Sequence, residues 1–376
     1  MILPYYQETY NKFIQEYEKL HVNPWHEINK ENLNEIYTNL INQMEINDDY
    51  TFIYLIKYII KKLSGKTDAH TALRLEYKQN FLPIYFRIIE NQVISIYPEK
   101  NTLKSINNVP IGKILKELEE ITAYGTNGKK IYELEKALFN KAILLSIPSL
   151  RGSQNLTFQM TNKDITFEKN EIPFDFAKYC FGGNATYQII DNCLIYNHKS
   201  VQPIFENQII NAYQELTKLD ITNIDTIIID LRGNFGGNAS LNKYIINFIE
   251  QNPDKKLYVL TDYRIFSAGR YALTNLINLN AITIGEEIAT PINCYGNSYN
   301  ETINGFTFSI STRYLNPLIK PIKTKEEFLQ IDKEMLKPII FHPDIFVTET
   351  LEDFLTGKDL ILEKALELSK TKTIIQ

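Results

Sequence analysis

Apolar residues in the first part of the chain recur at helical spacing. One face carries Tyr10, Phe13, Ile14 and Tyr17. A second run follows the spacing i, i+3, i+4, i+7, i+8, i+11 with Leu33, Ile36, Tyr37, Leu40, Ile41 and Met44. Asp48 and Asp49 are placed to cap a third helix, which Ser64-Gly65 ends. We therefore predict an N-terminal helical domain over residues 1–75.

The pattern changes to short β-like runs in the middle of the chain. Pro83-Ile84-Tyr85-Phe86 and Val93-Ile94-Ser95-Ile96 have the composition of strands, whereas residues 111–121 and 131–145 have helical spacing. This mixture predicts a small α+β middle module over residues 76–185.

From residue 186 onward, strands and helices alternate. Strands are expected at Cys193–Tyr196, Thr226–Ile229, Leu257–Leu260 and Ala281–Ile284, and a closing helix at about 351–368. The run Thr226–Ile229 is hydrophobic enough for a strand buried on both faces. Such alternation predicts crossover helices on a largely parallel sheet, so we expect an α/β domain over residues 186–376.

Composition narrows the classes of partner. Hydrophobic residues make up 44% of the 376 residues and charged residues 23%, which is typical of a globular protein. The net charge is −5 and no dense Lys/Arg stripe is present, so a nucleic-acid partner is not expected. Cys180, Cys193 and Cys294 show no CxxC pairing, and we predict neither a metal site, a disulfide framework nor a cofactor.

The sequence shows no signal for a membrane. The residues after Met1 lack the basic and apolar regions of a signal peptide, and the apolar stretch Thr51–Ile60 is too short to span a bilayer. A cytoplasmic location is expected for the chain as written, unless a leader has been removed.

A turn with three glycines follows the most apolar strand, in Asp230-Leu231-Arg232-Gly233-Asn234-Phe235-Gly236-Gly237. Glycines allow positive φ and leave N–H groups pointing into open space, where they can hold an anion. The Lys-Ser/Thr of a phosphate loop is missing, as is the GxGxxG pattern of dinucleotide sites. A tight turn without a function is the alternative.

Ser267 lies in Phe266-Ser267-Ala268-Gly269, between a strand and a helix. Small neighbours admit a substrate, and the first N–H groups of a helix can stabilise an oxyanion. An ordinary N-cap serine is the alternative. Because the two segments occur on successive strand–helix units, the N–H of Gly236 or Gly237 and that of Ala268 are predicted to face one carbonyl oxygen, as acyl transfer needs.

These segments resemble the tail-specific, or C-terminal-processing, serine protease family. Asp230–Gly237 is similar to its DLRGNxGG segment, Phe266–Gly269 to its FSAG segment, and Pro343–Val347 to its PDxxV strand. Gly285-Glu286-Glu287 with Tyr295-Gly296 resembles the loop after the nucleophile. The resemblance covers about residues 186–370 and implies a ClpP/crotonase-like αβ core with Ser267 as the nucleophile.

The resemblance also bears on the middle module. Many family members carry a PDZ domain there, and Ser105–Leu115 resembles the SINGxPI-x-x-IL stretch of such inserts. The glycine-rich carboxylate-binding loop of a PDZ domain is not evident, so we expect a degenerate PDZ-like module or another insert.

Two branches of the family differ in the base. One uses a lysine after the serine, but no lysine lies between Ser267 and Lys320. The other, similar to the tricorn core, uses a histidine in a D-x-H-T segment, which Asp68-Ala69-His70-Thr71 matches. The resemblance therefore implies that His70 is the base, since imidazole has a suitable pKa. It also implies an acidic partner, chosen from Glu334, Asp332, Glu326 and Glu327 with Glu334 ranked first.

The predicted function is thus that of a serine peptidase that acts on peptides or unfolded chains. A homo-oligomer is one state in which it could act. Two other classes stay open: a catalytically silent ligand- or peptide-binding protein on the same fold, and a crotonase-like lyase or thioesterase that would not need Ser267.

Overall fold

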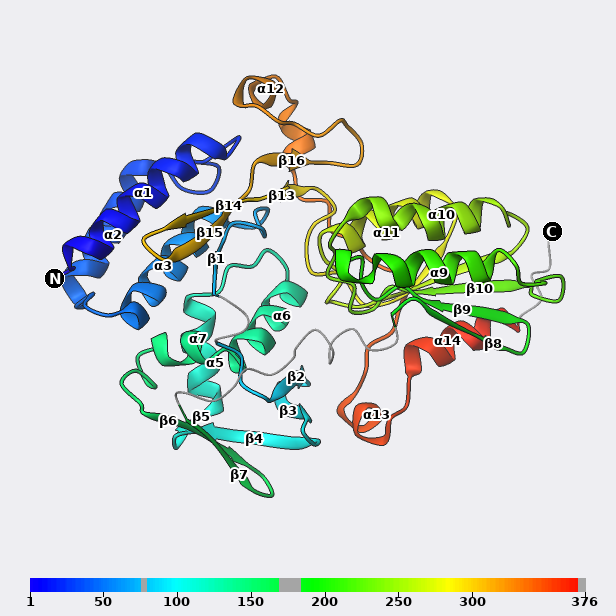
Figure 1. The fold of residues 1–376 in the computed structure, drawn as a ribbon, viewed down its shortest axis with the longest axis horizontal. Coiled ribbons are helices and arrows are strands. Elements are labelled where there is room, and N and C mark those ends of the chain that lie inside the picture. Colours follow the sequence, from blue (N-terminus) through cyan, green and yellow to red (C-terminus); the bar gives the residue numbers. More distant parts are fainter. Residues whose placement is uncertain (76–79, 169–183, 371–376) are drawn as a thin grey trace. The chain divides into compact units, whose positions relative to one another are not determined.

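The computed structural model describes residues 1–75, 80–168 and 184–370 (Figure 1). The chain forms two compact units. The first comprises Met1–Asp175 and Asn293–Ile339, and the second comprises Phe176–Ile292 and Ile340–Gln376. The predicted division into three domains stays a prediction, because the spatial grouping of residues does not show which segments fold independently. Cys180 lies outside the described residues.

Three helices begin the first unit, as predicted: α1 (Pro4–Leu20), α2 (Lys30–Gln43) and α3 (Asp49–Ser64). Asp48 caps α3 through a reciprocal pair of hydrogen bonds with Thr51. The helices pack with an antiparallel sheet in the order β1 (Ala72–Arg74), β15 (Phe306–Ile310), β14 (Tyr299–Ile303). Buried Phe13, Phe52 and Phe308 belong to their common core.

A second sheet of the first unit is antiparallel, in the order β2 (Tyr85–Ile89), β3 (Gln92–Tyr97), β4 (Asn101–Ile106), β6 (Asn155–Met160), β7 (Asp164–Glu168), with β5 (Val109–Pro110) paired to β4. Three helices accompany it, α5 (Ile111–Glu120), α6 (Asn127–Leu138) and α7 (Lys141–Ser146). The single helix predicted over 131–145 is therefore wrong. Helix α6 ends at Leu138, and Asn140 caps α7 by accepting a hydrogen bond from the N–H of Ile143.

The remaining elements of the first unit come from later in the chain. Strand β13 (Cys294–Gly296) pairs with β16 (Arg313–Leu315), and α12 (Lys325–Leu329) and the 3₁₀ helix η3 (Lys333–Leu336) follow. The bridge between Asp68 and Tyr295 joins β13 to the segment that contains His70.

The second unit is built on a six-stranded sheet in the order β17 (Ile345–Phe346), β12 (Ile282–Gly285), β11 (Lys256–Thr261), β10 (Thr226–Asp230), β9 (Cys193–Asn197), β8 (Thr186–Ile190). Only β8 runs antiparallel to its neighbour among these strands. Every residue of β10 is buried, as its apolar sequence predicts. The chain is thus a mixed α/β protein with several sheets.

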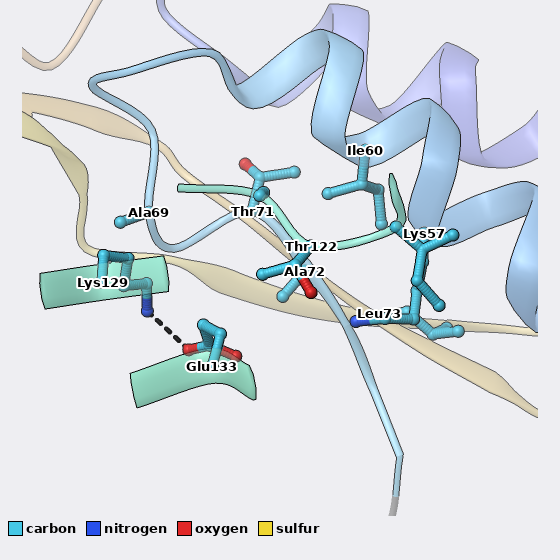
Figure 2. A pocket seen from close by; sticks show the side chains of 11 residues that line it. Lys57, Ile60, Ala69, Thr71, Ala72, Leu73, Thr122, Lys129 and Glu133 are labelled. Carbon is cyan, nitrogen blue, oxygen red and sulfur yellow. Dashed lines mark hydrogen bonds and ion pairs between the residues drawn. The ribbon is translucent and has the colours of Figure 1, made fainter. Parts of the chain in front are cut away.

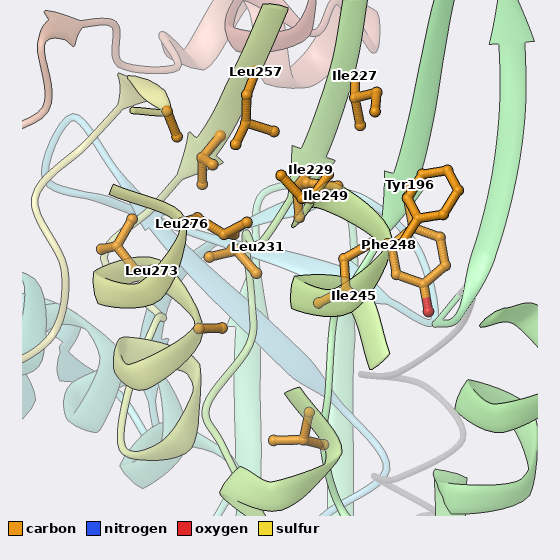
Figure 3. Close-up of a cluster of buried hydrophobic side chains, with 14 of the residues drawn as sticks. Tyr196, Ile227, Ile229, Leu231, Ile245, Phe248, Ile249, Leu257, Leu273 and Leu276 are labelled. Carbon is orange, nitrogen blue, oxygen red and sulfur yellow. The ribbon is translucent and has the colours of Figure 1, made fainter. Parts of the chain in front are cut away.

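Helices cover both faces of this sheet. Ile227 and Ile229 of β10 pack in one cluster with α9 (Glu206–Leu216), α10 (Lys243–Glu250) and α11 (Ala268–Asn278) (Figure 3). Ile228 packs on the other face with α14 (Leu360–Ser369). Short helices complete the unit: η1 (Pro203–Phe205), η2 (Ala239–Asn242) and α13 (Leu351–Thr356).

The parallel strands bring three connections to one edge. β9, β10 and β11 run in the same direction, so the residues that follow Asn197, Asp230 and Thr261 all leave the sheet at its carboxyl edge. In sheets of this kind ligands bind outside that edge.

No helix in the described part of the chain combines the length and apolar character needed to cross a bilayer.

Candidate active site

The glycine turn after β10 packs directly on Ser267. Gly236 has φ 97°, and a Cβ atom at this position would lie 2.8 Å from Cβ of Ser267 and 2.7 Å from the amide nitrogen of Ala268. At Gly237, with φ 135°, a Cβ atom would lie 2.3 Å from the carbonyl oxygen of Val201. Both positions therefore need glycine, for the backbone angle and for the close approach.

Ser267 has an unusual backbone conformation. Its φ is 52° and its ψ −119°, outside the left-handed helical region, and α11 begins at the next residue. The side chain makes no capping hydrogen bond to the helix, so Ser267 is not an ordinary N-cap serine. Such strain, of order 1–3 kcal/mol, is concentrated at functional sites, and a strained strand-to-helix turn presents the nucleophilic serine of α/β-hydrolases.

The backbone amides beside Ser267 divide into two groups. The N–H of Gly236 donates to Oδ1 of Asn234 at 3.0 Å, and the N–H of Gly233 donates to Oδ1 of Asp262 at 2.9 Å. Among the described residues, the N–H groups of Gly237 and Ala268 have no hydrogen-bond acceptor. The N–H of Gly236 is therefore engaged within the turn, which argues against its predicted role as an oxyanion donor, and the role of Gly237 and Ala268 stays a prediction.

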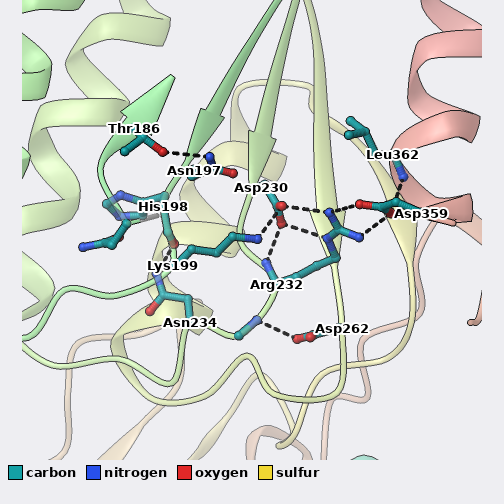
Figure 4. Close-up of polar contacts among 12 residues, drawn as sticks. Thr186, Asn197, His198, Lys199, Asp230, Arg232, Asn234, Asp262, Asp359 and Leu362 are labelled. Carbon is teal, nitrogen blue, oxygen red and sulfur yellow. Dashed lines mark hydrogen bonds and ion pairs between the residues drawn. The ribbon is translucent and has the colours of Figure 1, made fainter. Parts of the chain in front are cut away.

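A cluster of ion pairs anchors the start of the glycine turn. Lys199 and Arg232 both donate to the carboxylate of Asp230, and Arg232 also forms a two-pronged pair with Asp359 at 2.7 and 2.8 Å (Figure 4). Burial alone would raise the pKa of Asp230, but the charges of Arg232 and Lys199 outweigh it and hold that pKa well below the usual range. Asp230 stays ionised and fixes the residue before Gly233.

His70 lies in the first unit, in the loop after α3. Its Nδ1 lies 3.0 Å from the carbonyl oxygen of Tyr295. A carbonyl oxygen only accepts, so Nδ1 carries a proton, and in the neutral ring the lone pair is on Nε2. This is the tautomer that a general base acting through Nε2 requires. Oδ1 of Asp68 holds the turn by accepting from the N–H groups of His70 and Thr71 and from the hydroxyl of Ser311.

Two more histidines lie near Asp68: His21 is fully buried and His26 is half-buried. Nε2 of His21 lies 3.4 Å from Oδ2 of Asp68, and its ring stacks on His26. The ring of Tyr295 contacts both imidazoles. Burial would raise the pKa of Asp68, but His21, His26 and the Ser311 hydroxyl outweigh it and hold the pKa well below its usual range. A charged carboxylate therefore supports the His70 loop.

A cavity of about 60 Å³ borders the same loop (Figure 2). Ala69 and Thr71, on either side of His70, line it together with the ion pair Lys129–Glu133, whose atoms lie 2.6 Å apart. Pockets for small ligands usually measure 300 Å³ or more. This cavity is thus too small to receive a peptide.

Neither models of protein families nor curated proteins match the chain. The crystal structure of mature CPAF matches with a TM-score of 0.63 at 10% identity, covering 97% of this chain and 96% of that chain. The fold resembles that of mature CPAF. The structure of CPAF complexed with lactacystin gives a TM-score of 0.64 at 11% identity, covering 97% of each chain.

A further match is the photosystem II D1 C-terminal processing protease, with a TM-score of 0.47 at 11% identity over 92% of this chain and 94% of that chain; this score is too low to add to the argument. The neighbours include tail-specific proteases, so the likeness in fold that the motifs predict is confirmed. At 10–11% identity the likeness to CPAF establishes the fold, and activity has to be argued from the site.

The four candidates for the predicted acidic partner of His70 all lie at the protein surface. Glu334 is exposed and pairs with Lys337 at 2.6 Å. Asp332, Glu326 and Glu327 are exposed as well, and Asp332 and Glu327 accept backbone hydrogen bonds in their own short helices. The acceptor at Nδ1 of His70 is instead the carbonyl of Tyr295. The role of Glu334 stays a prediction.

Sequence reasoning missed three residues of the site: Asn234, Asn242 and His198. Asn234 and Asn242 hydrogen-bond to Phe266 and Ala268 of the nucleophile segment, and His198 hydrogen-bonds to both asparagines. Asn234 lies within the glycine motif, and His198 directly follows a strand that ends at the same edge. Position at the carboxyl edge of the sheet is therefore the signal that could have identified His198.

Proposed function

We propose that this chain is a serine peptidase that hydrolyses peptide bonds through an acyl-enzyme on Ser267. The observation that carries the proposal is the strained backbone of Ser267, held against the glycine turn beside two amides that have no acceptor among the described residues. Acyl transfer needs this combination of a nucleophilic hydroxyl and preorganised donors. The motif resemblance to tail-specific proteases supports a peptide as the acyl substrate.

In the proposed reaction, Nε2 of His70 takes the proton of the Ser267 hydroxyl while Oγ attacks the peptide carbonyl carbon. The oxygen that becomes negative accepts from the N–H groups of Gly237 and Ala268. The imidazolium then protonates the leaving amine, and His70 activates a water that releases the acyl group. Throughout, the Nδ1–H of His70 stays donated to the Tyr295 carbonyl.

We further propose that the second unit is a ClpP/crotonase-like core. Its parallel sheet with crossover helices, and its oxyanion donors on successive strand-to-helix turns, support this assignment.

Hydrolysis of a peptide library tests the proposal. Ser267→Ala should abolish cleavage and leave thermal stability nearly unchanged, since one half-buried hydroxyl is lost. The control is Ser240→Ala, which removes an exposed hydroxyl that donates to Oδ1 of Asn238 and should cleave like the natural protein. Cleavage by Ser267→Ala at the natural rate would refute the proposal. A folded natural protein that cleaves nothing would favour the silent binding alternative.

The same assay tests the base. His70→Ala should lower kcat by several orders of magnitude, as removal of a triad member does. Lys320→Ala should remain active. The reverse result would place the chain in the lysine-dependent branch.

A further inference from the structure

His198 is a fully buried histidine that the proposed reaction does not use. It directly follows β9, and its N–H donates to the carbonyl oxygen of Asp230 at 2.9 Å, at the end of β10. Its ring and its carbonyl oxygen bond to Asn242 and Asn234, which in turn contact two different parts of the proposed oxyanion site.

The ring of His198 is connected through Asn242 to Ala268, the first residue of α11. Nε2 of His198 lies 2.9 Å from Oδ1 of Asn242, and Nδ2 of Asn242 donates to the carbonyl oxygen of Ala268 at 2.9 Å. Because the Ala268 carbonyl only accepts, the amide nitrogen of Asn242 must face it, and the amide oxygen must face His198. Nε2 of His198 therefore carries the proton and donates.

The carbonyl oxygen of His198 is connected to the glycine turn through Asn234. It accepts from Nδ2 of Asn234 at 2.7 Å (Figure 4). Oδ1 of Asn234 in turn accepts from the N–H of Gly236 at 3.0 Å, and its main-chain oxygen accepts from the N–H of Phe266, also at 3.0 Å. A Cβ atom at Gly269 would lie 2.2 Å from that oxygen, so the turn and α11 pack without space between them.

The ring of His198 is not suited to act as a base. Its Nε2 holds a proton that is donated to Asn242, and its Nδ1 is enclosed without a hydrogen-bond partner among the described residues. Burial lowers the pKa of His198, which keeps the ring neutral.

We propose that His198 is a positioning residue that holds the two amides of the oxyanion site in register. Its ring fixes Ala268 through Asn242, and its carbonyl fixes the turn before Gly237 through Asn234. The inference rests on the proposed function, because it assigns a role relative to an oxyanion formed at Ser267. The two contacts can be separated by experiment. A substitution at position 198 removes the side-chain bond to Asn242 and leaves the main-chain bond to Asn234.

The test compares side chains that keep or remove the Nε2 donor. His198→Gln places an amide nitrogen near the position of Nε2, and His198→Phe keeps the ring volume without a donor. Labelling of Ser267 by a fluorophosphonate should slow by about 10- to 100-fold in His198→Phe, because small misplacements of an oxyanion donor reduce rate by up to this order. Most of the rate should return in His198→Gln. For a peptide substrate, kcat should fall while KM changes little, because the oxyanion contact forms only as charge develops.

Asn242→Leu breaks the same chain of hydrogen bonds at its second link. It should reproduce the defect of His198→Phe, and the double variant should be no slower than either single variant. If His198→Phe does not fold, Asn242→Leu decides alone. The control is His342→Phe, at an exposed histidine paired with Glu287, which should label like the natural protein.

Equal labelling of the natural protein, His198→Phe and Asn242→Leu would overturn the inference, as would additive losses in the double variant. Absence of any label on Ser267 in the natural protein would instead refute the proposed function.

Discussion

A methyl group at position 236 would lie against Cβ of Ser267 and the amide nitrogen of Ala268. Gly236→Ala should therefore displace the nucleophile from its donors and lower kcat by about 10²- to 10³-fold, the effect of losing one oxyanion donor. The matched control is Gly112→Ala, where an added Cβ atom meets nothing within 4 Å. Peptide hydrolysis and thermal unfolding check both variants. A Gly236→Ala enzyme with natural kcat would contradict the packing of the turn on Ser267.

Gly237 is a less selective position for such a test. A side chain there would collide with the main chain of Val201, so a loss of activity would mix a change of fold with a change of the donor.

The buried ring of His198 also makes stability depend on pH. Burial lowers its pKa in the folded state below the ordinary value of 6.5. The unfolded chain therefore binds a proton first as pH falls below 6.5, and the folded state loses stability from there toward its own lower pKa. His198→Gln should reduce this slope by up to about 1.4 kcal/mol per pH unit. Urea unfolding at pH 7 and pH 5 measures it. An unchanged slope would show that His198 titrates normally.

At the scale of elements, the pair between Arg232 and Asp359 joins the glycine turn to α14. Asp359 also caps that helix by accepting from the N–H of Leu362. Asp359→Asn keeps a good cap and removes the charge, so it isolates the ion pair. We expect a loss of about 1 kcal/mol in the free energy of unfolding, a modest value because the side chain of Asp359 is 40% exposed.

Chemical denaturation of Asp359→Asn and of Asp254→Asn measures this contribution. Asp254 pairs with Lys255 at the surface, and its substitution should leave stability nearly unchanged. Equal effects of the two substitutions on the free energy of unfolding would contradict a stabilising ion pair between Arg232 and Asp359.

Periodicity predicted the long helices and the buried parallel strands, but not where helices break. The helix expected over 351–368 is two helices, because Gly357 takes φ 78° and ends α13 before Asp359 caps α14. Strands β13 to β16 were not predicted. They are short, and β14 is largely exposed, so tertiary pairing rather than an apolar pattern defines them.

At the scale of the molecule, local motifs identified more of the site than long-range contacts could. Ser267 and the glycines lie in short segments whose chemistry is readable in sequence. By contrast, the contact between Tyr295 and His70 joins residues 225 positions apart, and that between Asn242 and Ala268 depends on how η2 meets α11. The choice of Glu334 relied on order along the chain, which gives no information about the atom that faces Nδ1 of His70.

The most direct test of the central claim is labelling of the natural protein with a fluorophosphonate, followed by mass-spectrometric mapping of the modified residue. A strained serine beside preorganised amides should react, so the account predicts a single adduct on Ser267, lost in Ser267→Ala and strongly slowed in His70→Ala. An unlabelled folded protein, or an adduct on another residue that persists in Ser267→Ala, would contradict it.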